Sequence, residues 1–131
     1  MKNLMGKHDN LMRHLEMTIE VSPPEYAKVA MPLREYHKNG MGVAHGGAIF
    51  ALADVTFGAA ANAGRDYGVV SLSTTIEYLL PGKTGPLIGE AFAIRNGKYI
   101  QNYEVKIFDG SGALIARCMA SGFQTDIKLP E

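Results

Sequence analysis

One carboxylate stands within a stretch of small and apolar residues, and this setting suits a general base. Asp54 lies in residues 48–61, where almost every other side chain is apolar or small. A carboxylate in such surroundings is costly to ionise unless it is paired or hydrogen-bonded. A base that is held in this way can take a proton from a bound water molecule. The alternative interpretation is structural: Asp54 caps a neighbouring backbone group or pairs with a basic side chain in the core.

A histidine and two glycines lie about two helical turns before this carboxylate. His45, Gly46 and Gly47 open the stretch, alanine and leucine favour helix along it, and Gly64 is a natural stop. The first N–H groups of a helix have no partner within the helix, so they can stabilise an oxyanion. A helix that is apolar on every side must also be enclosed by the rest of the domain. We therefore expect a base and an oxyanion site on one central helix, with Asp54 buried.

The flanking sequence predicts a β-sheet that encloses this helix. Apolar and polar residues alternate along several stretches, and Asn96-Gly97 is a strong hairpin-turn signal. A short amphipathic helix is expected over residues 4–16, and a core of about residues 17–125 follows it in a single domain spanning 1–131. The strands are expected at residues 18–21, 26–31, 69–80, 87–95, 98–108 and 113–124, with a tail at 126–131. The architecture is α+β.

The overall composition argues against several classes of function. The 131-residue chain has 13 basic and 13 acidic side chains, so neither nucleic-acid binding nor membrane-surface binding is expected. The single cysteine, Cys118, excludes an intramolecular disulfide and is a poor basis for a metal site. No apolar run is long enough to span a membrane, and the N-terminus lacks the pattern of a signal peptide. We expect a cytoplasmic protein without a bound metal.

Three segments together resemble one known family. They are HGGAIFALAD at residues 45–54, IEYLLPG at residues 76–82 and AIRNGK at residues 93–98. This combination is similar to the hotdog-fold acyl-CoA thioesterases, in the branch typified by the phenylacetate-pathway (PaaI-type) enzymes. The resemblance covers about residues 17–124. It implies a long central helix wrapped by a curved antiparallel sheet of five to six strands.

The resemblance also implies an activity and an assembly. Such proteins hydrolyse acyl-CoA thioesters to a free acid and CoA, with no cofactor other than the CoA that is part of the substrate. Two subunits pair edge to edge in a homodimer, and dimers associate into a homotetramer. The active site is expected at the dimer interface, where the helix start of one subunit faces the helix carboxylate of the other.

Residue by residue, the match gives a role to five positions. Asp54 corresponds to the catalytic carboxylate, acting either as a general base or as a nucleophile that forms a mixed anhydride. The amide of Gly46 corresponds to the donor that polarises the thioester carbonyl. Asn39 and His45 are expected to orient the substrate there, with a purely structural role in the turn as the alternative. Ser71 corresponds to a hydroxyl that positions the attacking water, and the alternative is that it is one of several hydroxyls that simply suit a strand.

Further residues are candidates for binding the substrate. Gly47 has no side chain, so a ligand can approach the helix closely there. Lys83, Arg95 and Lys98 lie near strand ends and turns, where they are expected to contact the phosphates of CoA. The alternative is that each is a solvated surface charge. The acyl group is left open between aryl, short and medium chains.

Two other functions are alternatives to hydrolysis. A hotdog domain can bind acyl-CoA without turning it over, as some regulators do, although residues 1–16 before the core are not strongly basic. A hotdog hydratase or dehydratase uses a catalytic histidine paired with an acid. That pattern differs from the Leu-Ala-Asp sequence at residues 52–54.

Overall fold

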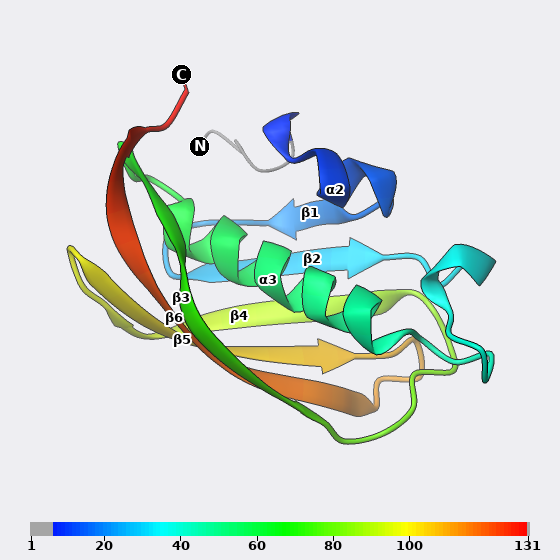
Figure 1. Cartoon of the computed structure of the whole chain (residues 1–131). Helices are drawn as coiled ribbons and strands as arrows, with labels where there is room; N and C mark the ends of the chain where they lie inside the picture. Colours follow the sequence, from blue (N-terminus) through cyan, green and yellow to red (C-terminus); the bar gives the residue numbers. More distant parts are fainter. Residues whose placement is uncertain (1–6, 131) are drawn as a thin grey trace.

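A long helix lies in the hollow of a strongly curved, six-stranded antiparallel sheet (Figure 1). The computed structural model describes residues 7–130 of the chain. The helix is α3 (Gly46–Asn62), at the place that the sequence predicted. The strands in chain order are β1 (Thr18–Val21), β2 (Tyr26–Met31), β3 (Tyr67–Tyr78), β4 (Leu87–Asn96), β5 (Ile100–Phe108) and β6 (Leu114–Lys128). They lie side by side in the order β1-β2-β4-β5-β6-β3, and the predicted α+β hotdog fold is confirmed.

A short helix precedes the sheet. It is α2 (Asn10–His14), and it begins after Asp9, whose side chain accepts a hydrogen bond from the N–H of Met12 at 2.9 Å. Aspartate is a preferred cap residue, and the helix expected over residues 4–16 is interrupted at Asp9 for this reason. Residues 4–6 of that prediction lie outside the described residues. Within residues 7–130, no helix has the length and apolarity that a membrane crossing requires.

The core lies between α3 and the concave face of the sheet. Leu52 and Phe57 of α3 are buried, and the ring of Phe57 meets Tyr103 of β5 edge to face, with centroids 5.4 Å apart. Burying one large apolar side chain stabilises the fold by about 1.5–3 kcal/mol. The largest fully buried side chains also include four from the strands, namely Met31, Leu87, Ile107 and Ile115. These contacts fix how α3 is seated in the sheet.

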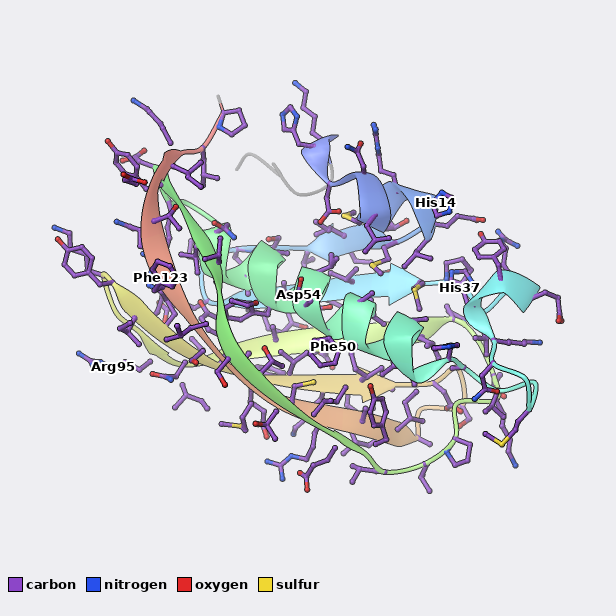
Figure 2. The ribbon with its side chains drawn as sticks, viewed as in Figure 1. His14, His37, Phe50, Asp54, Arg95 and Phe123 are labelled. Atoms are coloured by element: carbon purple, nitrogen blue, oxygen red, sulfur yellow. The ribbon has the colours of Figure 1, made fainter. Side chains whose placement is uncertain are left out.

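One stripe of α3 is left uncovered by the rest of the chain. Gly47 and Asp54 are exposed, and Phe50 and Ala51 between them are half-buried. Figure 2 shows Phe50 and Asp54 on successive turns of the helix. Residues three or four apart share one helix face, so these four form a continuous line. The prediction that Asp54 is buried is wrong for the single chain, because the sheet curls around only part of the helix.

A β-bulge in β3 changes which side of this strand faces the helix. The pairing of β3 with β6 shifts register between Ser71 and Ser73, which leaves Leu72 without a partner. In a regular strand, residues an odd number of positions apart lie on opposite faces. Here Ser71 and Tyr78, seven positions apart, both donate hydrogen bonds to α3. The bulge makes this possible, whereas the sequence predicted an unbroken alternation.

The last strand is longer than predicted. The tail expected at residues 126–131 continues β6 as far as Lys128, which pairs with Tyr67 at the start of β3. The hydroxyl of Thr125 also donates to the carbonyl of Gly68 at 2.7 Å. The polar end of β6 is therefore a strand because it pairs with β3. The hydrophobicity pattern of one segment does not reveal such pairing.

Candidate active site

The start of α3 leaves the N–H of Gly46 free. His45 is the N-cap residue, and its Nδ1 accepts a hydrogen bond from the N–H of Gly47 at 2.8 Å. The carbonyl of His45 accepts a hydrogen bond from the N–H of Ile49 at 3.0 Å. The N–H of Gly46 has no acceptor among the described residues, as is usual for the first residue of a helix. It can therefore donate to a bound oxygen.

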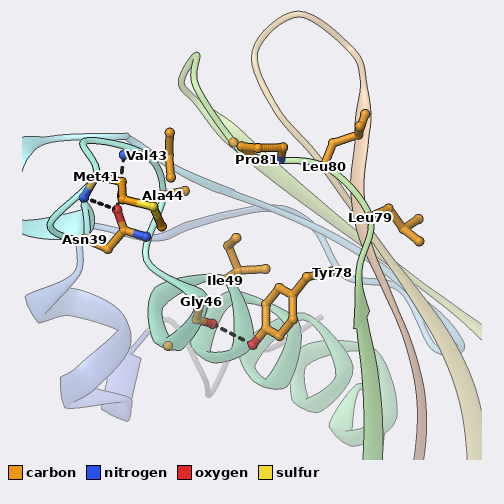
Figure 3. Close-up of a pocket in the computed structure, with 12 residues that line it drawn as sticks. Asn39, Met41, Val43, Ala44, Gly46, Ile49, Tyr78, Leu79, Leu80 and Pro81 are labelled. Atoms are coloured by element: carbon orange, nitrogen blue, oxygen red, sulfur yellow. Dashed lines mark hydrogen bonds between the residues drawn. The ribbon is translucent and has the colours of Figure 1, made fainter.

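Gly46 and Gly47 border a pocket of about 490 Å³ at this end of the helix (Figure 3). Most of the walls are aliphatic or aromatic, and one amide side chain is present. A pocket of this kind suits a small, largely apolar group. The residues that line it are Asn39, Met41, Val43, Ala44, Gly46, Gly47, Ile49, Tyr78, Leu79, Leu80, Pro81 and Gly82.

Asn39 shapes the turn that leads into the helix. Its Oδ1 accepts hydrogen bonds from the N–H of Met41 at 2.9 Å and from the N–H of Val43 at 3.4 Å (Figure 3). Its own N–H donates to the carbonyl of Val43 at 2.9 Å. Asn39 thus has the structural role that was the alternative for it, and it also lines the pocket. His45 has a structural role too, because its ring caps the helix.

Tyr78 belongs to the pocket, although the sequence analysis gave it no role. Its hydroxyl donates a hydrogen bond to the carbonyl of Gly46 at 2.9 Å (Figure 3). Partial burial raises the pKa of Tyr78 above its ordinary value. The ordinary pKa of tyrosine is already well above neutral pH, so the phenol is protonated and can donate. Tyr78 is part of the IEYLLPG family segment, which could have marked it as a site residue. The sequence analysis treated it only as one position in an alternating strand.

The structure brings Asp54 and Ser71 together. The hydroxyl of Ser71 donates to Oδ1 of Asp54 at 2.9 Å, so one oxygen of the carboxylate is held and the other is open. Both side chains are exposed in the single chain. A hydrogen bond of this kind restricts the orientation of the carboxylate.

The carboxylate and the free amide lie at different places along the helix. Asp54 follows Gly46 by eight residues and is absent from the residues that line the pocket. At 1.5 Å of rise per residue, the two positions are about 12 Å apart along the helix axis. One chain therefore does not place both groups on the same small substrate group.

The three basic candidates do not form one cluster within a chain. Lys83 is exposed beside Gly82 of the pocket. Arg95 and Lys98 are exposed near the turn between β4 and β5, which lies at the opposite end of the sheet in Figures 1 and 2. The full length of β4, about 30 Å, separates this turn from the pocket end. None of the three lines the pocket, and Lys83 alone follows directly after a residue that does.

The turn between β4 and β5 is held by a residue that the sequence analysis did not single out. The guanidinium of Arg65, just after α3, donates to the carbonyl of Gly97 at 2.8 Å and to Oδ1 of Asn96 at 2.9 Å. It also donates to the carbonyl of Lys98 at 3.1 Å and to Gln124 of β6 at 2.9 Å. Arg65 therefore fixes the hairpin through its backbone, a role that no local pattern signals.

His37 fixes the loop that carries the pocket turn. It lies at the end of the short 3-10 helix η1 (Glu35–His37) and is fully buried. Its Nδ1 accepts a hydrogen bond from the N–H of Arg34 at 2.9 Å, and its Nε2 lies 2.8 Å from the carbonyl of Leu15. Its own carbonyl accepts from the N–H of His45 at 2.8 Å. His37 thus ties the end of the N-terminal segment to the start of α3.

No group of three or more histidine, cysteine, aspartate or glutamate side chains is placed to hold a metal ion in the part of the chain that the structure describes.

The comparison with known families decides the class of the protein. The model of the Thioesterase superfamily matches residues 41–116, more than half of the chain. The chain belongs to the Thioesterase superfamily. The matched residues contain the pocket turn, α3, β3 and most of the sheet, so the resemblance inferred from the three sequence segments is confirmed, together with its enzyme class of thioester hydrolase.

Individual relatives of this thioesterase cover most of its length. A protein of Archaeoglobus fulgidus is 30% identical over 132 residues, which are 98% of this chain and 84% of the relative. The acyl-coenzyme A thioesterase PaaI of Escherichia coli is 28% identical over 113 residues, which are 86% of this chain and 80% of the relative.

Solved structures agree with the fold. The structure of the E. coli PaaI protein from the phenylacetic acid degradation operon has a TM-score of 0.89 at 25% identity, covering 98% of this chain and 94% of that one. A mutant structure of the phenylacetic acid degradation protein PaaI from Thermus thermophilus has a TM-score of 0.80 at 29% identity, covering 88% of this chain and 98% of that one. The predicted similarity to the PaaI-type branch is confirmed.

Proposed function

We propose that this thioesterase hydrolyses acyl-CoA thioesters, with Asp54 as the general base and the N–H of Gly46 as the oxyanion donor. The observation that carries the proposal is the free N–H of Gly46 beside an apolar pocket, on the same helix as a carboxylate that Ser71 holds by one oxygen. The thioesterase relatives, among them one with acyl-coenzyme A in its name, support the substrate class.

The proposed reaction follows from these groups. The open oxygen of Asp54 takes a proton from water while the water oxygen attacks the carbonyl carbon of the thioester. The N–H of Gly46 stabilises the negative charge that develops on the carbonyl oxygen. The carbon–sulfur bond then breaks, and the CoA thiolate takes up the proton that the base removed. The alternative route is direct attack by Asp54 on the thioester to form a mixed anhydride. We favour the general-base role because the hydroxyl of Ser71 holds one oxygen of the Asp54 carboxylate.

The separation of the two groups supports a site shared between two chains. Because Gly46 and Asp54 are about 12 Å apart along one helix, a thioester polarised by the amide of one chain needs the carboxylate of another. The exposed stripe at residues 47–54 leaves that carboxylate free to face a partner. We therefore propose a homodimer in which each site takes Gly46 from one subunit and Asp54 from the other.

The free edge of β3 is the proposed contact between the two subunits. β3 is the last strand of the sheet, so one of its edges has no neighbouring strand within residues 7–130. An open edge of this length favours pairing with another strand. Near the bulge it exposes Val70 by 42% and Leu72 by 58%, which a partner strand would cover.

A second contact is proposed for the homotetramer. The convex face of the sheet carries exposed apolar side chains on neighbouring strands, and this surface suits the pairing of dimers. They are Phe92, Ile94, Ile100, Met119 and Phe123. The register places Ile100 directly opposite Phe123, while Glu104 lies between Phe92 and Met119.

For the CoA moiety, we propose Lys83 as a phosphate contact at the mouth of the pocket. Of the three basic candidates, Lys83 is the one next to a pocket residue, Gly82, in a single chain. Arg95 and Lys98 would need a partner subunit to bring them there. The reaction as proposed uses no metal and no cofactor apart from the CoA of the substrate.

The proposal is tested by replacing Asp54. Asp54→Asn keeps the size of the side chain and removes the base, so we expect kcat to fall by about 10²–10⁴-fold. Turnover is measured as thiol release from aryl, short and medium acyl-CoA substrates. The thiol of Cys118 does not contribute to the assay signal, because Cys118 is 1% exposed and burial raises the pKa of its thiol to about 11.

The matched control is Asp126→Asn, which changes an exposed aspartate on β6 and is expected to keep wild-type kcat. A folded Asp54→Asn protein with undiminished turnover would refute the role of Asp54. Wild-type protein that binds acyl-CoA and releases no thiol from any substrate would favour the binding function instead.

A further inference from the structure

A single peptide group at the start of α3 is held at both of its ends. The carbonyl of Gly46 accepts the hydrogen bond from the hydroxyl of Tyr78 at 2.9 Å. The N–H of Gly47, on the other side of the same planar peptide, donates to Nδ1 of His45 at 2.8 Å. Because a peptide group is rigid and planar, these two bonds together fix its orientation.

The neighbouring peptide is fixed as well. It joins the carbonyl of His45 to the N–H of Gly46, and that carbonyl accepts the helical bond from Ile49 at 3.0 Å. Of the donors and acceptors on these two peptides, the N–H of Gly46 is the one without a partner in the described part of the chain. The network thus leaves one donor available.

Two adjacent glycines need such support. Gly46 and Gly47 have no Cβ, so their backbone dihedrals are far less restricted than those of other residues. The carbonyl of Gly46 also accepts the regular helical bond from the N–H of Phe50 within α3. The bond from Tyr78 is the one that ties this peptide to β3. The N–H of Gly46 lies in the neighbouring peptide, across the Cα of Gly46. The bond from Tyr78 therefore fixes where this donor stands relative to β3 and to the pocket wall.

We propose that Tyr78 is a positioning residue, which aims the N–H of Gly46 at the carbonyl oxygen of the substrate by holding the next peptide. This inference rests on the proposed function, and it adds a residue to the reaction. Tyr78 acts through Gly46 and does not itself donate to the substrate, since its one O–H is used on the carbonyl of Gly46.

The geometry of Tyr78 supports this role over simple packing. Its side chain is 52% exposed, so the ring contributes little to the core. The bulge in β3 turns the strand so that this side chain reaches the helix from the edge of the sheet. A Cβ placed on Gly46 would lie 3.4 Å from the hydroxyl and ring of Tyr78, so the two residues are in direct contact.

The test is Tyr78→Phe, which keeps the ring and removes only the hydroxyl. An oxyanion donor acts in the transition state, so we expect kcat to fall about tenfold while KM changes less than about twofold. The matched control is Tyr67→Phe on the same strand, whose side chain is 41% exposed and contacts neither glycine. It is expected to retain wild-type kcat and KM.

A double substitution tests whether Tyr78 acts through Gly46. Gly46→Pro removes the N–H that Tyr78 is proposed to aim. In that background, Tyr78→Phe is expected to change kcat by less than about twofold, because coupled residues are not additive. An equal tenfold loss in both backgrounds would contradict the inference.

A measurement that does not depend on activity completes the test. In protein labelled with ¹⁵N-glycine, Tyr78→Phe is expected to shift or broaden the amide signals of Gly46 and Gly47, and Tyr67→Phe is expected to leave them unchanged. Unaltered glycine signals, or an active wild-type enzyme whose kcat survives Tyr78→Phe, would overturn the inference and leave the proposed function intact. Absence of wild-type turnover would instead count against the proposed function, and the glycine signals would still decide whether Tyr78 holds the peptide.

Discussion

At the scale of single residues, the N–H of Gly46 can be removed by proline, which adds a ring beside the side chain of Tyr78. Gly46 is the first residue of α3, a position where proline is tolerated because no helical bond is lost. His45 before it has φ −67° and ψ 133°, the extended conformation that a residue before proline prefers. Gly46→Pro therefore deletes the donor in a backbone that is already suited to proline.

We expect Gly46→Pro to lower kcat by about 10²–10³-fold, the usual effect of losing one oxyanion donor, with little change in the melting temperature. Steady-state kinetics and thermal unfolding measure the two quantities. Gly46→Ala is the control, since it retains the N–H and its Cβ would lie at an ordinary contact distance of 3.4 Å from Tyr78. Equal activity of the two variants would show that the amide does not contribute.

At the scale of elements, the loop between β2 and α3 depends on His37. His37→Leu removes both ring hydrogen bonds and leaves the N–H of Arg34 and the carbonyl of Leu15 without their partner. An unsatisfied buried group costs about 1–3 kcal/mol, so we expect the free energy of unfolding to fall by about 2–4 kcal/mol. Urea titration measures this. His14→Leu changes an exposed histidine of α2 and is expected to alter stability by less than about 0.5 kcal/mol.

The elements were predicted from sequence where the signal is local. The small and apolar residues of α3, the alternation in β4 and β5, and the Asn96-Gly97 turn each follow from neighbouring residues, and each was placed within a few positions. The family motif likewise led to the residues at the helix start. Such signals suffice because helix and turn preferences act over a few residues.

Features that depend on distant partners were missed. The bulge at Leu72 contains neither glycine nor proline. The sequence of the strand therefore gave no sign that Ser71 and Tyr78 would lie on the side of β3 that faces α3. The exposure of Asp54 also could not be read from the helix, because a residue pattern does not say how far a sheet closes around it. The end of β6 is a strand because β3 pairs with it.

At the scale of the whole molecule, the proposed shared site makes a prediction about mixed dimers. When chains with Asp54→Asn are combined with chains carrying Gly46→Pro, one of the two sites in a mixed dimer receives an intact Gly46 and an intact Asp54. We expect such dimers to recover about half of the wild-type turnover, although each variant alone is nearly inactive. The measurement uses co-expressed chains with two different tags, purified in succession, and thiol release as the readout.

The control is a dimer of two Asp54→Asn chains with the same two tags, which is expected to stay inactive. Mixed dimers that are no more active than their parents would place both groups in the same chain and refute the shared site. A protein that elutes as a monomer at assay concentration and still turns over substrate would refute it as well.

The location of Gly46 and Asp54 on one helix has a genetic consequence. In the proposed dimer, a chain that has lost both groups supplies the damaged partner to each of the two sites. A dimer of this chain with a normal chain then has no active site, whereas a dimer of a normal chain with a chain that has lost only one group keeps one active site. An allele with both lesions is therefore expected to be dominant over a normal copy, and alleles with one lesion each are expected to complement one another.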